Sequence, residues 1–432
     1  MGLGPGLVED FLKSAPPAGR LLVAFSGGLD SHVLLHLLLQ AANDRALAAL
    51  HVHHGLQAGA DRWSEHCAAV CRGLGIPFQV LRVKVAREGQ QGLEAAARDA
   101  RYAALRVSVQ PHDLLLTAHH QDDQAETVLL QLMRGAGPAG LAAMPRLAPF
   151  GAGWLGRPLL EVARADLEAY AREAGLRWIE DPSNADHRFD RNYLRHEIMP
   201  RLARRWPGVT RNLAVAARIQ ADTLEQLDTL ARGDMERCRG LRPDTLSVAG
   251  VNALRRGRRR NLLRLWLIDK GFEPPPRARM DSLLDSVLTA GRDRAPSVAW
   301  GEVGIRRYRD DLYAMSPLSP PAPLPRSWDP RETLRLPGLD IDLTMDWLLS
   351  RGVNPEACRA PFELGYRQGG ERIRLPGREH SSELKTLMQE AGLPPWERDR
   401  LPLLWRSGRL LAVWGHWVAA PDEFNAAAGC DA

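Results

Sequence analysis

The segment Ser26-Gly27-Gly28-Leu29-Asp30-Ser31 carries the residue types best suited to holding a nucleotide. Its two glycines permit a tight turn in which successive N–H groups point into one concavity and bind an anion. An apolar run precedes the segment and a helical pattern follows it, so the orphan N–H groups of a helix start also favour negative charge there. A turn that only joins a strand to a helix would not explain the flanking serines and the aspartate. We therefore predict that residues 26–31 bind phosphate groups.

Other nucleotide-binding signatures do not fit the chain. There is no GxxxxGK[ST] sequence, and no lysine lies near residues 26–31, which excludes a Walker-type NTPase. The pattern GxGxxG occurs twice, at residues 135–140 and 151–156. Neither copy follows a convincing strand, and prolines (Pro138 and Pro158) interrupt what comes after, so dinucleotide binding of the Rossmann type is not predicted.

Carboxylates are the candidate metal ligands and catalytic groups. Asp123 and Glu126 are three residues apart at a predicted helix start, so they share one face and could hold Mg²⁺ or position a nucleophile. Asp30, beside the phosphate-binding loop, could share that metal ion. First-turn acids can also act only as helix caps, and this alternative stays open.

Histidines cluster after two of the predicted strands, at His53, His54, His119 and His120. A zinc site would need further cysteine or acidic ligands at metal spacing, which these histidines lack. Histidines at strand ends more often hydrogen-bond a ligand or the backbone. We assign His53 to the nucleotide site.

Arginines with an aromatic neighbour are the candidate substrate contacts. Arg98 and Arg101 share a helical face beside Tyr102, and Arg191 and Arg195 are spaced i, i+4. Guanidinium groups suit phosphate contacts. A solvated helix face with surface ion pairs is the alternative for both groups.

The elements that must position these residues alternate between strand and helix. Apolar runs predict strands over 21–25, 46–55, 77–85 and 113–120, and amphipathic patterns predict helices over 62–75 and 92–110. This order predicts an α/β fold with a doubly wound, mainly parallel sheet. Ligands bind beyond the carboxyl ends of such strands, and the polar clusters fall there.

Changes in composition along the sequence predict further domains after residue 200. Residues 1–200 form the predicted catalytic domain, 201–315 a helical, basic domain, 316–330 a proline-rich linker, and 331–432 a small α/β domain. The arginine-rich run 255–264 is either a solvated helix face or a track for nucleic-acid phosphates.

Composition limits the functional class. The 432 residues are 45% hydrophobic and 25% charged, and no apolar run is long enough to span a membrane. The N-terminus lacks a secretory signal pattern, and the five cysteines form no CxxC pair, so a reducing cytoplasm is expected. Residues 1–200 carry slightly more acidic than basic residues, whereas the whole chain has a net charge of +5. This asymmetry suits chemistry in the first half and polyanion binding in the second.

The segment Ser26–Ser31 resembles the fingerprint of the PP-loop, or N-type, ATP pyrophosphatases, which cleave ATP to AMP and pyrophosphate while adenylating a carbonyl oxygen. Further motifs are similar, in order, to bacterial tRNA(Ile)-lysidine synthetases through residues 20–200 and again near the C-terminus. These motifs are HVHHGLQ (51–57), ARDARY (97–102), AHHQDDQAET (118–127), RPLL (157–160), DPSN (181–184), RNYLR (191–195), GGER (369–372), SELK (382–385) and PPWER (394–398). The residues between about 200 and 315 match only in being helical.

The resemblance implies an adenine-nucleotide α-hydrolase-like catalytic domain that uses ATP and Mg²⁺. It implies adenylation at C2 of the wobble cytidine in an isoleucine tRNA with the anticodon CAU, followed by attack of the amine of free L-lysine. The loop and His53 would then bind ATP, with Mg²⁺ on Asp30 and Asp123. The implied catalytic residues are Asp30, Asp123, Glu126 and Arg195. The implied substrate or tRNA contacts are Arg98, Arg101, Tyr102, Arg191 and Arg195.

Three alternatives remain open at this point. A tRNA thiolase of the same superfamily normally has a reactive cysteine pair, and an enzyme similar to GMP synthetase needs a glutaminase cysteine; neither has a suitable counterpart among the five cysteines. The third alternative is an RNA-binding module with an inactive ATP site. Intact Asp30, Asp123 and Glu126 argue against it, and ATP turnover would decide. The sequence yields no prediction for the oligomeric state, the lysine-binding residues or the general base.

Overall fold

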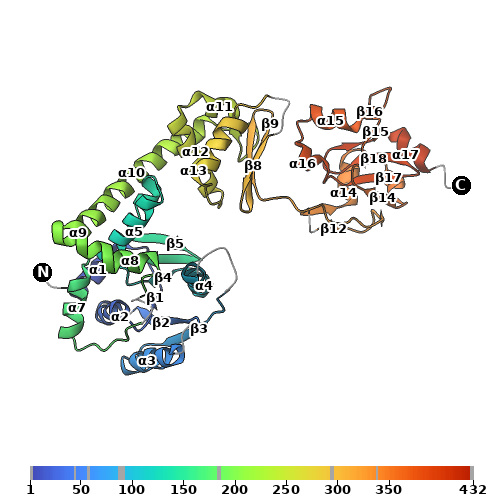
Figure 1. Cartoon of the computed structure of the whole chain (residues 1–432). Coiled ribbons are helices and arrows are strands. Elements are labelled where there is room, and N and C mark those ends of the chain that lie inside the picture. Colours follow the sequence, from blue (N-terminus) through green and yellow to red (C-terminus); the bar gives the residue numbers. More distant parts are fainter. Residues whose placement is uncertain are drawn as a thin grey trace. The chain divides into compact units, whose positions relative to one another are not determined.

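The computed structural model describes residues 3–42, 45–55, 59–85, 93–181, 186–291, 296–336 and 339–428. These residues form two compact units, Met1–Leu230 and Ala231–Ala432. The long helix α10 (Val209–Arg237) begins in the first unit and ends in the second (Figure 1).

The first unit contains a six-stranded sheet with the order β3-β2-β1-β4-β6-β5. Its strands are β1 (Arg20–Ala24), β2 (Ala46–His53), β3 (Phe78–Arg82), β4 (Asp113–Leu116), β5 (Leu147–Phe150) and β6 (Gly153–Gly156). All neighbouring strands are parallel except β5, which runs antiparallel to β6 at the edge. The helices of this unit before α10 are α1 (Pro5–Ser14), α2 (Leu29–Ala41), α3 (Ala60–Gly73), α4 (Leu93–Ser108), α5 (Gln121–Met133), α6 (Pro138–Leu141), α7 (Arg164–Glu173), α8 (Asp190–Tyr193), η2 (Leu194–Ile198) and α9 (Met199–Arg205).

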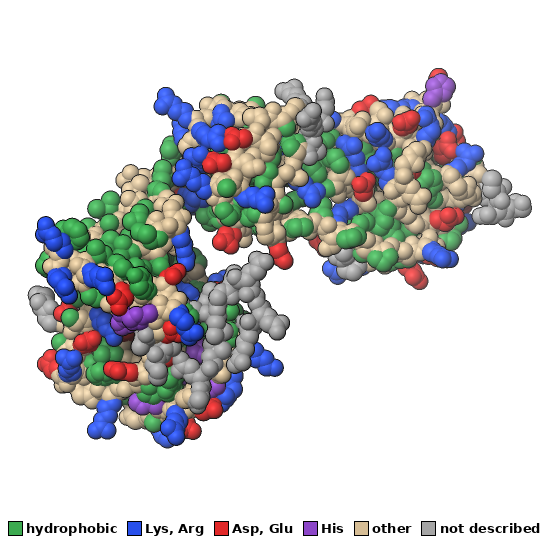
Figure 2. All heavy atoms as spheres, viewed as in Figure 1, with side chains coloured by type: hydrophobic (Ala, Val, Ile, Leu, Met, Phe, Trp, Pro, Cys, Tyr) green, Lys and Arg blue, Asp and Glu red, His purple; other side chains and the backbone are tan. Residues whose placement is uncertain are grey.

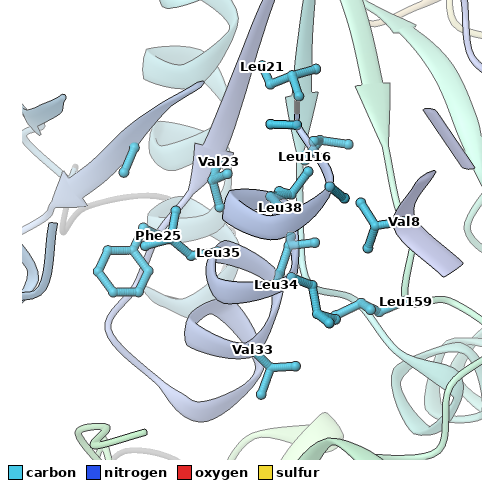
Figure 3. Close-up of a cluster of buried hydrophobic side chains, with 14 of the residues drawn as sticks. Val8, Leu21, Val23, Phe25, Val33, Leu34, Leu35, Leu38, Leu116 and Leu159 are labelled. Carbon is cyan, nitrogen blue, oxygen red and sulfur yellow. The ribbon is translucent and has the colours of Figure 1, made fainter. Parts of the chain in front are cut away.

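Helices cover both faces of this sheet. On β1, Leu21 and Val23 point into one buried cluster with side chains of α1, α2, α3 and α7 (Figure 3). Leu22, between them, points to the other face and packs with Leu105 and Val109, at the C-terminal end of α4. Burial on both faces explains why the strands read as continuous apolar runs. The predicted doubly wound α/β fold is confirmed.

The strand order creates a crevice at the carboxyl end of β1. The chain leaves β1 toward β2 on one side, whereas β4 lies on its other side. Ligands of doubly wound sheets bind at such a reversal of strand order. The last predicted strand, 113–120, ends early at Leu116, so the following Thr117–His120 segment is free to lead into α5 beside that crevice.

The second unit begins with the end of α10 and a helical layer packed on a small sheet. The helices are α11 (Val248–Ala253), α12 (Arg256–Asp269), α13 (Arg277–Ser282) and η3 (Leu283–Val287). The antiparallel sheet has the order β7-β10-β9-β8, with β7 (Leu246–Ser247), β8 (Ser297–Trp300), β9 (Val303–Tyr308) and β10 (Asp311–Met315). The middle region is helical as predicted, but its three strands between 297 and 315 were not predicted. In β9 the alternate burial of Ile305 and Arg307 shows the period of two that could have indicated a strand.

The C-terminal part of the second unit is a small α/β fold rich in strands, as predicted. Its main sheet has the order β11-β14-β17-β18-β19 and is antiparallel. The strands are β11 (Ser327–Trp328), β12 (Leu334–Leu336), β13 (Ile341–Leu343), β14 (Phe362–Gly365), β15 (Arg372–Ile373), β16 (Ser382–Glu383), β17 (Leu403–Arg406), β18 (Arg409–Val413) and β19 (Trp417–Val418). The helices are α14 (Met345–Ser350), η4 (Pro355–Cys358), α15 (Leu384–Glu390), α16 (Pro395–Arg398) and α17 (Pro421–Ala428). None of the helices in the described parts of the chain has both the length and the apolar character required to cross a bilayer.

Candidate active site

The phosphate-binding loop lies where β1 passes into α2. Gly27 has φ +82°, a left-handed conformation that favours glycine, and a Cβ there would lie 2.8 Å from Cys67 Sγ. Gly28 is the N-cap of α2, and the first helical bond runs from His32 N–H to the Gly28 carbonyl over 3.0 Å. The N–H groups of residues 29–31 therefore have no partner within the helix and are suited to an anion.

Both serines of the loop fix its shape. The Ser31 hydroxyl donates to the Gly28 carbonyl over 3.0 Å and accepts from the Ser26 N–H over 3.3 Å. The two hydroxyl oxygens lie 3.1 Å apart. These bonds give a structural reason for the paired serines, which a simple glycine turn would not need.

A cavity of about 830 Å³ lies next to this loop. That volume is in the range of small-molecule and cofactor sites. Its lining includes many of the predicted site residues, namely Ser26, Gly28, Leu29, Asp30, Ser31, His53, Arg101, Tyr102, Asp123 and Arg195. The remaining predicted residues, Gly27, Arg98, Glu126 and Arg191, are not part of the lining.

Three carboxylates surround the buried His120, which ends the Thr117–His120 segment. Its Nε2 lies 3.7 Å from Asp30 and 3.4 Å from Asp123, and its Nδ1 lies 3.6 Å from Asp122. Burial alone would lower the pKa of His120, but the three carboxylates outweigh burial and raise it. The carboxylates therefore favour the positively charged form of His120.

The two carboxylates that line the cavity have opposite pKa shifts. Burial would raise the pKa of Asp123, but His120 and the nearby arginines lower it to about 2. For Asp30, burial is the largest effect and raises the pKa despite His120. Asp30 Oδ1 is buried and has no hydrogen-bond partner among the described residues. A carboxylate oxygen left open in a nucleotide-sized cavity suits a ligand cation.

Glu126 holds two arginines of the next segment. Its carboxylate, of which only 2% is exposed, accepts from Arg191 Nε over 3.0 Å and from Arg195 Nε over 2.6 Å. Arg195 also donates to Asp123 Oδ1 over 2.9 Å. The arginines come from α8 and η2, a π-helical turn of a kind often found at functional sites. Glu126 thus anchors arginines, one of which lines the cavity.

The other predicted side chains come from β2 and α4. His53 Nε2 lies 3.1 Å from Asp61 Oδ1. The guanidinium groups of Arg98 and Arg101 lie 5.0 and 5.5 Å from the centre of the Tyr102 ring, within cation–π range. Parts of two motifs, Leu56-Gln57 and Pro182–Asn184, lie outside the described residues.

The structure adds cavity residues that the sequence did not single out. Arg164, at the start of α7, lines the cavity, and its N–H donates to Asp122 Oδ2 over 3.0 Å. The segment Trp178–Asp181 also lines it, and the Ile179 N–H donates to the Gly27 carbonyl over 3.0 Å. His119, which was noted in the sequence but not assigned to the site, lines the cavity too, and burial lowers its pKa to about 3, so it is neutral. Arg164 and Ile179 are about 140 residues from the loop in sequence, and only the tertiary fold brings them together.

The basic run 255–264 has mainly intramolecular partners. Arg256 bonds Asp285 over 2.7 Å, and Arg260 bonds Asp281 over 3.0 Å. Arg258 pairs with the buried Asp234, and Arg259 donates to the carbonyl of Leu254 over 2.7 Å. These contacts favour the helix-face alternative over a track for phosphates.

The described cysteines have none of the features of reactive thiols. Cys67, Cys71, Cys238 and Cys358 are all buried. Burial raises the pKa of each, to about 12 for Cys67 and about 11 for Cys71. Reactive cysteines need a lowered pKa. Within the described ranges there is also no group of three His, Cys, Asp or Glu side chains arranged to hold a metal ion.

Comparisons with known proteins agree along the chain. Residues 7–202 match a family described as PP-loop domain, 246–313 match a TilS substrate binding domain, and 362–431 match a TilS substrate C-terminal domain. The tRNA(Ile)-lysidine synthase of Alkalilimnicola ehrlichii is 45% identical over 95% of this chain and 93% of its own length. The proteins of that name from Methylococcus capsulatus and Pseudomonas aeruginosa are 43% identical (97% of this chain, 98% of the relative) and 46% identical (92% and 89%).

Proposed function

The chain belongs to the tRNA(Ile)-lysidine synthase family, and from that premise we propose that it converts the wobble cytidine of a CAU-anticodon isoleucine tRNA into lysidine. It is an ATP-using enzyme of the ligase type that acts on tRNA. The observation that carries the proposal is the cavity that the loop of residues 26–31, with its Asp30, lines together with Asp123 and Arg195.

The reaction has two steps in this proposal. The C2 carbonyl oxygen of cytidine attacks the α-phosphorus of ATP, and pyrophosphate leaves. The ε-amine of lysine, having lost a proton, then attacks C2, and AMP leaves with the oxygen atom. Adenylation is needed because the ring oxygen alone is a poor leaving group.

Residues of the chain supply binding and charge stabilisation in both steps. The free N–H groups of residues 29–31 and the dipole of α2 hold phosphate oxygens. Arg195, aligned by Glu126, stabilises the negative charge that develops at the α-phosphate. His120, which lies close to both Asp30 and Asp123, keeps the two carboxylates together beside that phosphate. Arg101 and Tyr102, which also line the cavity, contact the tRNA substrate.

The open oxygen of Asp30 fits Mg²⁺. Magnesium is usually held by one or two carboxylates together with substrate phosphates and water, not by a cage of protein ligands alone. One open carboxylate oxygen at the phosphate loop agrees with that pattern. Asp30, with Asp123 as the second candidate, would hold the ion, which when bound neutralises phosphate charge.

The experiment that tests the ATP chemistry measures AMP release from α-labelled ATP with lysine and an unmodified tRNA transcript. We expect AMP only when the transcript is an isoleucine tRNA with CAU, and none when the wobble cytidine is replaced by guanosine. AMP formation that is independent of tRNA would contradict the proposal, because it would point to a different carbonyl substrate. No AMP with any transcript would favour an RNA-binding protein without ATP chemistry.

A further inference from the structure

Two buried side chains below the phosphate loop have no role in the chemistry described so far. Cys67, on α3, is completely buried, and its Sγ occupies the space that a Cβ on Gly27 would need, 2.8 Å away. His51, on β2, is 6% exposed. Both come from elements that follow the loop in sequence, so neither was visible as part of the loop motif.

His51 holds Phe25, the residue immediately before the loop. Its Nδ1 lies 2.9 Å from the Phe25 carbonyl. Because a carbonyl only accepts, Nδ1 must carry the hydrogen. Burial lowers the pKa of His51, so the ring is neutral, and this bond determines its tautomer. Cys67 Sγ lies 3.6 Å from the same nitrogen, so the two side chains are in contact with each other.

The loop is held on its other side as well. The Gly27 carbonyl accepts from the Ile179 N–H over 3.0 Å, and the Phe25 N–H donates to the Leu50 carbonyl over 2.8 Å. Gly27 is therefore held by a hydrogen bond from Ile179 and packed against the sulfur atom of Cys67. A change in the size of residue 67 would move the loop, because close-packed interiors transmit such changes.

We propose that Cys67 and His51 are positioning residues for ATP: the thiol supports Gly27, and the imidazole holds the Phe25 carbonyl. The pair determines where the N–H groups of the loop meet the phosphates. Its disruption weakens ATP binding while leaving the contacts with tRNA and lysine unchanged. The inference rests on the proposed ATP-dependent function of this loop.

The test compares two buried cysteines of the same helix. Cys67→Val places extra carbon atoms against Gly27 and is expected to raise the KM for ATP about tenfold, in line with the cost of overpacking. Cys71→Val is the matched control, because Cys71 is equally buried and lies one helical turn further along α3. It is expected to lower Tm similarly while keeping the KM for ATP within about twofold. Cys67→Ser, which preserves size, should retain a KM near that of the parent protein.

The histidine is tested by two variants. His51→Asn keeps a donor near the position of Nδ1 and should preserve the KM for ATP, whereas His51→Phe removes the donor and should raise it about fivefold. Equal changes for Cys67→Val and Cys71→Val, or for the two His51 variants, would overturn the proposal and reduce both residues to core filling. If Cys67→Val does not fold, Cys67→Ala takes its place: an increase of about threefold in the KM for ATP is expected from the gap it leaves, and an unchanged KM would overturn the proposal.

AMP release by the parent protein distinguishes a failure of this inference from a failure of the proposed function. If the parent protein releases AMP with tRNA, but Cys67→Val and Cys71→Val change the KM for ATP equally, only the positioning role fails. If it releases no AMP, the proposed function fails. Calorimetric titration with ATP still tests the positioning role in that case: a Kd that increases for Cys67→Val but not for Cys71→Val supports it, and equal Kd values contradict it.

Discussion

Asp30 and Asp123 line the same cavity but face different electrostatic surroundings. Asp123 is already neutralised by Arg195 and His120 and has a pKa of about 2. Asp30 has one oxygen without a partner among the described residues, and burial raises its pKa. At this site, therefore, Asp30 has an oxygen atom available for a ligand, whereas Asp123 mainly holds His120 and Arg195 in place.

Replacing Asp30 by asparagine is expected to reduce AMP formation about 10²- to 10³-fold, the size of effect seen when a group that stabilises developing charge is removed. The affinity for tRNA should remain within about twofold, because the cavity keeps its arginines. Rapid quench with labelled ATP and filter binding of tRNA measure the two quantities. The control is Asp166→Asn, an exposed first-turn acid of α7. An active Asp30→Asn protein would remove the role in cation binding.

Replacing Glu126 by glutamine should release Arg191 and Arg195 from their shared anchor. We expect the free energy of unfolding to fall by about 1–3 kcal/mol, as for lost hydrogen bonds to charged groups. We also expect kcat to fall about 10- to 100-fold with a smaller change in the KM for ATP, because a misplaced Arg195 stabilises the transition state less. Urea denaturation and steady-state kinetics measure these effects. Glu236→Gln, which removes an exposed pair with Arg239, should change neither quantity; similar losses in both variants would contradict the anchor role.

At the scale of elements, the sequence was most informative where periodicity and turn chemistry agree. The four strands and three helices predicted between residues 20 and 120 are all present, because long apolar runs and a glycine turn leave few alternatives. The approach of Arg164 and Ile179 to the loop could not be predicted, since it depends on how α7 and the segment after it pack. The pairing of Glu126 with Arg191 is also tertiary: both residues were selected, but not their contact.

At the opposite end of the sheet, the contacts of Asp113 predict how stability depends on pH. Asp113, at the start of β4, accepts from Arg20 Nε over 3.0 Å and from the Gln110 N–H over 2.8 Å. Burial would raise the pKa of Asp113, but these bonds hold it below its ordinary value of 3.8. The stabilisation is therefore complete above that pH and is lost as the pH falls through the lower pKa of the folded state. Asp113→Asn should cost about 1–3 kcal/mol at pH 7, and the difference from the parent protein should shrink in acid. Denaturation at several pH values measures this, and a difference that stays constant into acid would contradict it.

The ion pairs of α12 predict that its arginines stabilise the fold and do not contact RNA phosphates. Because Arg256 and Arg260 pair with Asp281 and Asp285, replacing both arginines by glutamine should lower Tm. The slope of log affinity against log salt should stay unchanged, whereas losing one phosphate contact would lower it by about one. Melting curves and salt titrations with tRNA provide the two readouts. A lower slope with an unchanged Tm would instead show that the arginines of residues 255–264 contact RNA phosphates.

At the scale of the whole molecule, we propose that the ATP chemistry lies in the first part of the chain and that much of the tRNA binding lies in the second. The loop and the carboxylates belong to the first unit, and the excess of positive charge lies after residue 200. Basic side chains are visible on both units (Figure 2). A substrate as long as tRNA needs contacts away from the reacting base, and cations supply most of that affinity. The boundaries at 200, 315 and 330 remain predictions.

The central claim is that lysine is joined to one tRNA in an ATP-dependent reaction. The most direct measurement follows labelled L-lysine with ATP, Mg²⁺ and an unmodified isoleucine tRNA transcript that bears CAU. A methionine tRNA with the same anticodon serves as the control. We expect stable incorporation into the isoleucine transcript alone, with one AMP released per lysine. AMP release without incorporation of lysine would contradict the claim, and equal incorporation into both transcripts would contradict its specificity.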